Sequence, residues 1–198
     1  MAVLEQYHRY AAPLRMAESC SDFPGALRVE VLDCNGRELD EDGCLRLPDP
    51  QRPDLPDVLT GPEGFYEHRH DDLVAFRVVN TSHARLKVTL FDCAPEGAVS
   101  VLGEEVLGPG TGRVFWWDAV PGRPFPMSVL AGRRVSLDRV VAVGTSAVER
   151  SLRHLQTAPG ETFAAALAAE YRAVGAGPSR FPTPERWTAT RATLRTRA

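Results

Sequence analysis

The sequence predicts a mainly β protein, an antiparallel β-sandwich with short flanking helices, in a single domain over residues 1–198. Apolar and polar side chains alternate with a period of two along residues 72–93, which is the pattern of strands with two distinct faces. Turn-forming clusters such as Asn35-Gly36 and 108–112 divide the chain into short segments. Helical periodicity is confined to the two ends, and short strands between closely spaced turns are typical of a sandwich.

The longest alternating pattern predicts two central strands, over residues 73–80 and 85–92. The Asn-Thr-Ser-His tetrapeptide at 80–83 separates them and supplies side chains that tolerate turn geometry and bond to their own backbone. Because this connection is short and polar, we expect the two strands to pair as a hairpin at the centre of the sandwich.

The other sandwich strands are expected between residues 26 and 145, followed by one final strand. Alternating or apolar segments bounded by turn residues predict strands at 26–33, 44–47, 98–102, 113–118, 127–130, 137–145 and 186–194. Apolar residues at helical spacing predict a helix at 2–12, within the N-terminal segment 1–12, and two helices within 147–174, at 147–156 and 162–174. Ser146, with Glu149 three positions later, matches a capping box at the start of the first of these two.

Residues 47–64 contain five prolines and therefore cannot pair as a central strand. We expect a long surface loop, which in a compact domain is often functional. Four carboxylates on it would suit an arginine-bearing partner: Asp49, Asp54, Asp57 and Glu63. The alternative is a tolerated surface insertion. In either case, removing residues 48–62 is expected to leave the core strands intact.

Composition argues against two classes of partner and indicates a compartment. The net charge of −3 and the pI of about 6.0 argue against a nucleic-acid-binding surface. No apolar run approaches the ~20 residues of a membrane-spanning helix, and the opening residues do not resemble a signal peptide. The cysteines show no CxxC spacing and stand at Cys20, Cys34, Cys44 and Cys93. We therefore expect free thiols in a reducing, cytoplasmic environment, without membrane contact.

Residues 68–72, His-Arg-His-Asp-Asp, are the strongest candidate for a metal site. His68, His70 and Asp72 would share one face of a strand, and transition metals accept imidazole and carboxylate ligands. A solvated strand edge accounts for the same residues, and we favour that interpretation, so that no metal is predicted.

The remaining motifs do not indicate catalysis either. Cys34 and Cys93 follow Asp33 and Asp92, and an adjacent carboxylate raises the pKa of a thiol, which is the wrong direction for a nucleophile. The glycine cluster at 108–112 lacks the lysine of a phosphate-binding loop. We therefore predict buried structural cysteines, no cofactor and no enzymatic activity.

Trp116 and Trp117 are neighbours in a predicted strand, so their side chains point to opposite faces. One can belong to the core, whereas the other, if exposed, could stack on sugar rings or fill a pocket of another protein. The alternative is that one ring lies in the core and a helix covers the other. The candidate interaction residues are therefore Trp116, Trp117, Asp49, Asp54 and Asp57.

The order of several short motifs resembles a region found downstream of caspase-like peptidase domains in some bacterial proteins. The segment of that family that ends in N-x-S is similar to Asp72-Leu-Val-Ala-Phe-Arg-Val-Val-Asn80-Thr-Ser82, with Asp71 in place of a glycine. Further motifs of the family are similar to 86–92, 97–102, Pro109-Gly110, 139–145 and Trp187-Thr188. The resemblance covers most of residues 1–195.

The resemblance implies an accessory β-sandwich beside a peptidase, which would lie on another chain or on a longer form of this one. It transfers no catalytic residue, because the caspase histidine and the Gln-Ala-Cys-type motif are absent from the sequence. The leading hypothesis is a non-catalytic protein-interaction or regulatory module associated with a caspase-like peptidase. The alternative is a ligand-binding sandwich of the carbohydrate type that uses an exposed Trp116 or Trp117.

Overall fold

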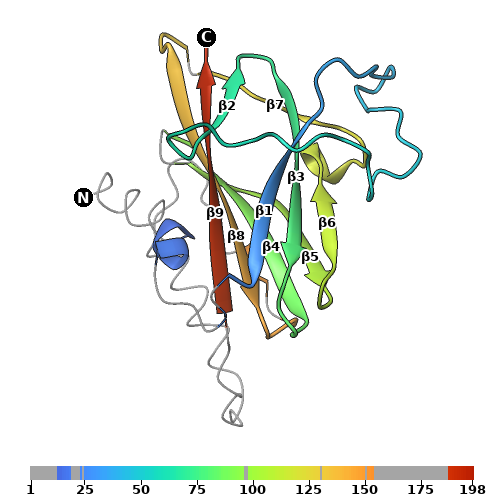
Figure 1. The fold of residues 1–198 in the computed structure, drawn as a ribbon, viewed down its shortest axis with the longest axis vertical. Helices are drawn as coiled ribbons and strands as arrows, with labels where there is room; N and C mark the ends of the chain where they lie inside the picture. The colour runs from blue at the N-terminus through green and yellow to red at the C-terminus, as the bar shows by residue number, and fades with distance from the viewer. Residues whose placement is uncertain are drawn as a thin grey trace.

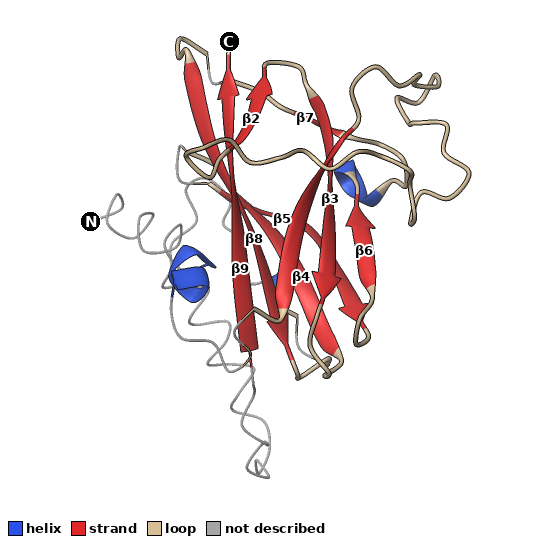
Figure 2. Ribbon diagram, in the orientation of Figure 1, coloured by secondary structure: helices blue, strands red, loops and turns tan. Residues whose placement is uncertain are grey.

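The computed structural model describes residues 13–18, 23, 25–95, 98–129, 131–149, 151–153 and 187–198, which form two β-sheets (Figure 1, Figure 2). The four-stranded sheet contains β1 (Leu27–Asp33), β3 (Leu73–Asn80), β6 (Gly112–Phe115) and β7 (Phe125–Pro126). The five-stranded sheet contains, in spatial order, β2 (Tyr66–Arg69), β9 (Trp187–Arg197), β8 (Val135–Thr145), β4 (Leu86–Cys93) and β5 (Val99–Leu107). This mainly β, sandwich-like architecture confirms the predicted fold class.

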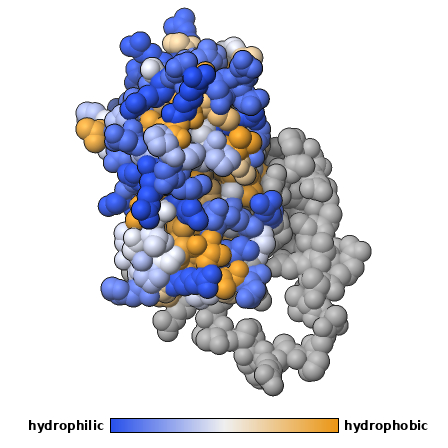
Figure 3. Space-filling model, turned by 90° about the vertical axis from the view of Figure 1, so that its right-hand side faces the viewer, coloured by the Kyte–Doolittle hydropathy of each residue, from blue (hydrophilic) through white to orange (hydrophobic). Residues whose placement is uncertain are grey.

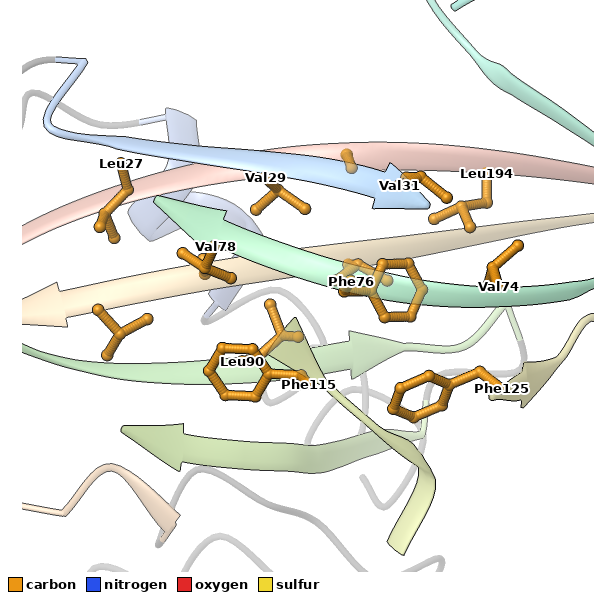
Figure 4. Packing of buried hydrophobic residues seen from close by; sticks show 14 of the residues in the cluster. Leu27, Val29, Val31, Val74, Phe76, Val78, Leu90, Phe115, Phe125 and Leu194 are labelled. Atoms are coloured by element: carbon orange, nitrogen blue, oxygen red, sulfur yellow. The ribbon is translucent and has the colours of Figure 1, made fainter. Parts of the chain in front are cut away.

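The strands are antiparallel in every pair of the described sheets except one, since β2 runs parallel to β9. The core lies between the sheets, where alternate residues of each strand point inward. Figure 4 shows side chains of both sheets meeting there, among them Phe76 of β3, Leu90 of β4 and Phe125 of β7. The ring centres of Phe76 and Phe125 lie 5.1 Å apart. Burial of one face per strand explains the period of two in the sequence.

The two central strands exist where the sequence predicts them, but the predicted hairpin between them is wrong. β3 pairs with β1, β6 and β7, whereas β4 pairs with β5 and β8 in the other sheet. Val78 of β3 and Val88 of β4 belong to the same core cluster and reach it from opposite sheets. A period of two fixes which residues share a face, but it does not say whether the faces lie side by side or opposite each other.

The side chain of Asn80 stabilises the connection through which the chain passes from one sheet to the other. Its side chain is fully buried, and its amide nitrogen donates hydrogen bonds to the carbonyl oxygens of Ala84 (2.8 Å), Leu107 (3.2 Å) and Gly108 (3.1 Å). Its amide oxygen accepts hydrogen bonds from the backbone and hydroxyl of Ser82. We call this end of the sandwich the turn end, and the opposite end, where β2 and β7 lie, the open end (Figure 1).

The outer face of the five-stranded sheet is covered by residues that precede β1 and residues that follow β8 in the sequence. Leu14, Met16 and Ala17 of the helical segment 13–18 pack on it, together with Leu152, against Phe91, Cys93, Val99, Val141 and Val143. The predicted helices at 2–12 and 162–174 lie outside the described residues. In the described residues no α-helix follows Ser146 for the predicted capping box to cap, because residues 148–149 form a turn and 151–152 have no regular structure.

Glu104 on β5 explains why the described part of the predicted helix 147–156 is not α-helical. Its carboxylate accepts hydrogen bonds from the Ser151 hydroxyl (2.8 Å), the Leu152 backbone nitrogen (3.1 Å) and Arg153 Nε (3.1 Å). These groups are fixed against the sheet by one carboxylate, so the prediction of a helix from apolar spacing alone is wrong here.

Several other strand predictions need correction at their ends. Strand 113–118 stops at Phe115, because Trp117–Ala119 form a 3-10 turn in which Asp118 has a φ of 53°. The strand expected at 127–130 is replaced by β7, two residues earlier. The strand expected at 44–47 is reduced to an isolated bridge between Leu39 and Leu45. β2 was not predicted, because charged residues obscure its alternation.

The proline-rich stretch is a cover for the outer face of the four-stranded sheet. Leu55, together with Leu45 just ahead of the stretch, is buried with Leu32, Ala75 and Trp116. The loop also bonds to the edge of β1, since the nitrogen of Asp33 donates to Pro56 and the nitrogen of Val58 donates to Val31. The expectation that residues 48–62 can be removed without disturbing the core is therefore wrong. Proline excludes a ladder strand, but it does not exclude burial.

Candidate binding site at the open end of the sandwich

The two tryptophans differ in burial, and Trp116 packs with Leu32, Leu55 and Ala75 on the outer face of the four-stranded sheet. Trp116 is 3% exposed, and its indole nitrogen donates a hydrogen bond to the carbonyl of Pro50 at 3.0 Å. Trp117 is 39% exposed, and its ring centre lies 5.7 Å from that of Phe125 in an edge-on arrangement. The proline-rich loop, not a helix, covers Trp116. Trp117 is thus the member of the pair that can contact a partner.

A cavity of about 250 Å³ opens between the sheets beside Trp117. Apolar side chains form most of its wall and include Phe76, Leu102, Trp117, Phe125, Met127 and Val140. The polar part of the lining consists of Asp92 of β4, Ser136 and Asp138 of β8, and Ser128. An apolar pocket with a few convergent polar groups is the usual form of a binding site.

Strand register explains why polar groups converge here. The inner face of β4 runs from Leu86 through Val88 and Leu90 to Asp92, and Asp92 lies opposite Val140. Further along β8, Asp138 lies opposite Leu194 and Ser136 lies opposite Thr196. The same row continues to β2, where His68 is the neighbour of Thr196. The inner face of the five-stranded sheet is therefore apolar at the turn end and polar at the open end.

Nε2 of His68 and Oγ1 of Thr196, which belong to this row, are buried and have no hydrogen-bond partner among the described protein atoms. The two residues are only 6% and 0% exposed. Burial lowers the pKa of His68, although the charges of Asp72, Asp33 and Glu67 act in the opposite direction. Nδ1 of His68 lies 3.9 Å from the Asp72 carboxylate, which is too far for a hydrogen bond. The imidazole is thus held in a poorly satisfied environment.

The histidines do not form the metal site considered from the sequence. His68 points inward, whereas His70 is exposed beyond the end of β2, and its Nδ1 accepts a hydrogen bond from Val129 at 3.2 Å. Among the residues that the structure describes, no group of three His, Cys, Asp or Glu side chains is placed to hold a metal ion. The interpretation as a solvated strand edge fits Arg69, His70 and Asp71, but it is wrong for His68.

The buried thiols have the electrostatics expected of structural cysteines. Cys34 and Cys93 are both 0% exposed. Burial first, and then the neighbouring carboxylates Asp33 and Asp92, raise the pKa of each thiol to about 12. A thiol with so high a pKa is not ionised near neutral pH and is a poor nucleophile. Cys44 is a free, partly exposed thiol, and Cys20 lies outside the described residues.

The loop that covers Trp116 carries most of the charge near the candidate site. Residues 37–57, which we call the acidic lobe, contain seven carboxylates and three arginines, a net charge of −4, whereas the whole chain carries −3. Asp49 and Asp54 are exposed. Asp57 is paired with Arg77 at 3.0 Å and is therefore less available to a partner.

Backbone and side-chain contacts fix the acidic lobe against the turn that carries Trp117. The nitrogen of Leu45 donates to the carbonyl of Gly122 (2.8 Å), and Arg123 donates to the carbonyl of Asp42 (3.0 Å). The nitrogen of Trp117 in turn donates to the carbonyl of Arg123 (2.9 Å). Trp117 therefore stands between the acidic lobe and the cavity.

The sequence reasoning identified Trp117 but missed the polar inner face. Asp92 was visible as the next inward position after Leu86, Val88 and Leu90, and that spacing could have flagged it. Both faces of β4 are apolar, however, so the inner face could not be chosen from the sequence. Nothing in the sequence placed Ser136 or Asp138 beside it, because the pairing of β4 with β8 spans about fifty residues.

No protein-family model, curated protein or solved structure matches this chain significantly. Within the part of the chain that the structure describes, none of the helices has both the length and the apolar character needed to cross a bilayer. Figure 3 shows the side that faces right in Figure 1, where hydrophilic side chains surround separate apolar areas. A partner that binds this side would contact both hydrophilic and apolar side chains.

Proposed function

We propose that this protein is a non-catalytic interaction module that binds a protein partner at the open end of the sandwich. The observation that carries the proposal is the position of Trp117, 39% exposed between a cavity and the acidic lobe. Tryptophan is enriched among the residues that dominate binding energy at interfaces, and it acts best when it is held rigidly. The neighbouring negative charge would attract a basic surface of the partner.

The sequence resemblance suggests that the partner is a caspase-like peptidase in a bacterial cytoplasm. The module would dock on this peptidase or regulate it. Free Cys34, Cys44 and Cys93 are consistent with a reducing compartment. The high pKa of the two buried thiols makes neither of them a suitable nucleophile. The overall acidic charge supports a protein partner over nucleic acid.

The test begins with a tagged form of the full chain, purified together with its partners from cells that express it. We expect a caspase-like peptidase among them, and the two purified proteins should then bind each other in a calorimetric titration. Trp117→Ala should weaken this binding at least tenfold. Val106→Ala is the control, since Val106 is 38% exposed on β5 and matches Trp117 in exposure. Equal affinities of wild type and Trp117→Ala for the peptidase would rule the proposal out.

A carbohydrate is the second candidate ligand, because Trp117 lines a cavity that also presents Asp92, Ser136 and Asp138. A sugar ring can stack on an indole while its hydroxyl groups donate to carboxylates. Titration with a panel of monosaccharides, followed by Trp117 fluorescence in a Trp116→Phe, Trp187→Phe background, distinguishes the two functions. A saturable change with one sugar, lost in Asp92→Asn, would favour the carbohydrate.

A further inference from the structure

We propose that the cavity beside Trp117 receives an apolar side chain from a basic segment of the protein partner. This inference rests on the proposed function and names the kind of segment that the open end would recognise. Two features of the molecule carry it. The wall of the cavity selects the apolar side chain, and the charge of the acidic lobe selects the basic residues on either side of that side chain.

The wall of the cavity favours an apolar group over a charged one. Most of the described lining residues are apolar. The two carboxylates in the lining, those of Asp92 and Asp138, already have interaction partners within the chain. A charged group that enters the cavity would therefore leave water without an uncompensated charge of opposite sign to receive it, whereas an apolar group gains by leaving water.

The shape and size of the cavity suit a single side chain. The ring centre of Phe125 lies 5.7 Å from that of Trp117 and 5.1 Å from that of Phe76, so that three rings form one side. Partly buried Met127 also lines the space, and its flexible thioether can adapt to an inserted group. The volume of about 250 Å³ is below the roughly 300–1,000 Å³ of sites that hold drug-sized molecules. A side chain that fills it would make dispersion contacts with the rings.

The acidic lobe identifies the residues that flank this side chain. The lobe contains seven carboxylates against three arginines, and Asp49 and Asp54 are exposed on it. It is fixed beside the cavity, because Arg123 accepts a hydrogen bond from the nitrogen of Trp117 and donates one to the carbonyl of Asp42. A segment that places an apolar side chain in the cavity would thus bring its neighbouring residues near this negative charge. Lysine or arginine at those positions would complement it.

The experiment titrates the full chain with blocked pentapeptides and follows the Trp117 indole and Met127 methyl signals by NMR. The test peptide has a central leucine with two lysines on either side. One control peptide replaces the leucine with alanine, and the other replaces the four lysines with glutamates. The test peptide should shift both signals saturably, with a dissociation constant on the order of a millimolar. Each control peptide should bind more weakly by a factor of about ten or more.

Two variants separate the cavity from the charge. Leu102→Phe narrows the cavity and should remove the preference for leucine over alanine. Asp49→Asn/Asp54→Asn should weaken binding of both lysine peptides by the same factor, so that the preference for leucine remains. Glu105→Gln, at an exposed carboxylate on β5, is the matched control and should bind all three peptides as the wild type does.

Three results with the wild-type chain would overturn the inference: equal affinities for the leucine and alanine peptides, equal affinities for the lysine and glutamate peptides, or no saturable shift of the Trp117 and Met127 signals. These comparisons need no variant, so they remain decisive even if Leu102→Phe does not fold. Failure here can be told apart from failure of the proposed function. If Trp117→Ala still weakens binding of the peptidase, the partner stands, and only the assignment of a basic segment with an apolar side chain is lost.

Discussion

The two ends of the sandwich differ in whether their buried polar side chains have hydrogen-bond partners. At the turn end, Asn80 is fully buried, and both atoms of its amide have hydrogen-bond partners. Thr188, also near this end, is 1% exposed and donates its hydroxyl to the carbonyl of Phe23 at 2.8 Å. At the open end, Nε2 of His68 and Oγ1 of Thr196 are buried without a partner.

This difference indicates that the two ends of the sandwich have different roles. A buried polar group whose bonds are all made specifies a turn and stabilises it. A buried polar atom without a partner costs about 1–3 kcal/mol of stability. The open end also holds the cavity and Trp117. We infer that the turn end maintains the fold, whereas the open end carries a stability cost in the region where binding is proposed.

Asn80→Ala should have the largest effect of the substitutions that test this comparison. It removes donors from three carbonyls inside the turn end, so we expect the free energy of unfolding to fall by about 3 kcal/mol or more. Asn35→Ala is the matched control at the open end. Asn35 is exposed, although its side chain accepts a bond from Leu73, and water can replace that bond at a cost of about 1 kcal/mol or less. Urea unfolding monitored by tryptophan fluorescence measures both, and similar losses would remove the contrast.

Thr196→Val and Thr188→Val should change stability in opposite directions, although both lie on β9. Valine nearly matches threonine in shape, so each substitution mainly removes a hydroxyl. At Thr196 the lost hydroxyl has no partner, and stability should rise by up to about 1 kcal/mol. At Thr188 a buried bond is lost, and stability should fall by about 1–2 kcal/mol. Losses of equal size in both variants would show that the open end is as well satisfied as the turn end.

The sequence could predict the faces of the strands better than their partners. The alternation in residues 73–80 and 85–92 located both strands to within one residue. The alternation could not exclude a hairpin between the two strands. The chain passes to the other sheet at Asn80, whose hydrogen bonds to Leu107 and Gly108 span more than twenty-five residues and are not visible in a local pattern. Short polar turns are common in hairpins, and the prediction of a hairpin relied on that local preference.

The candidate site was only partly predictable for the same reason. Trp116 and Trp117 were expected in one strand, but β6 ends at Phe115 and Trp117 begins a 3-10 turn, so strand alternation does not explain their different burial. His68 was placed at a solvated edge because its neighbours are charged, yet its pairing with Thr196 turns it inward. Leu55 in the proline-rich loop was overlooked, since the prolines around it indicate a loop and say nothing about burial. Non-local packing decides each of these cases.

The smallest expected effect is a pH dependence of stability at the open end. Burial lowers the pKa of His68 below its ordinary value of 6.5, despite the opposing charges of Asp72, Asp33 and Glu67. As the pH falls below about 6.5, the unfolded chain gains a proton at this histidine before the folded chain does. His68 therefore makes the free energy of unfolding decrease with falling pH, until the pH drops below its lowered pKa.

The measurement is the free energy of unfolding at several pH values from about 7.5 to 5, for wild type and His68→Gln. Groups common to the two proteins titrate in both of them, so their contribution cancels in the difference. His68→Gln should lose less stability on acidification than wild type. If His68→Gln and wild type decline in parallel, the buried imidazole has its ordinary pKa, and the open end is better solvated than its geometry indicates.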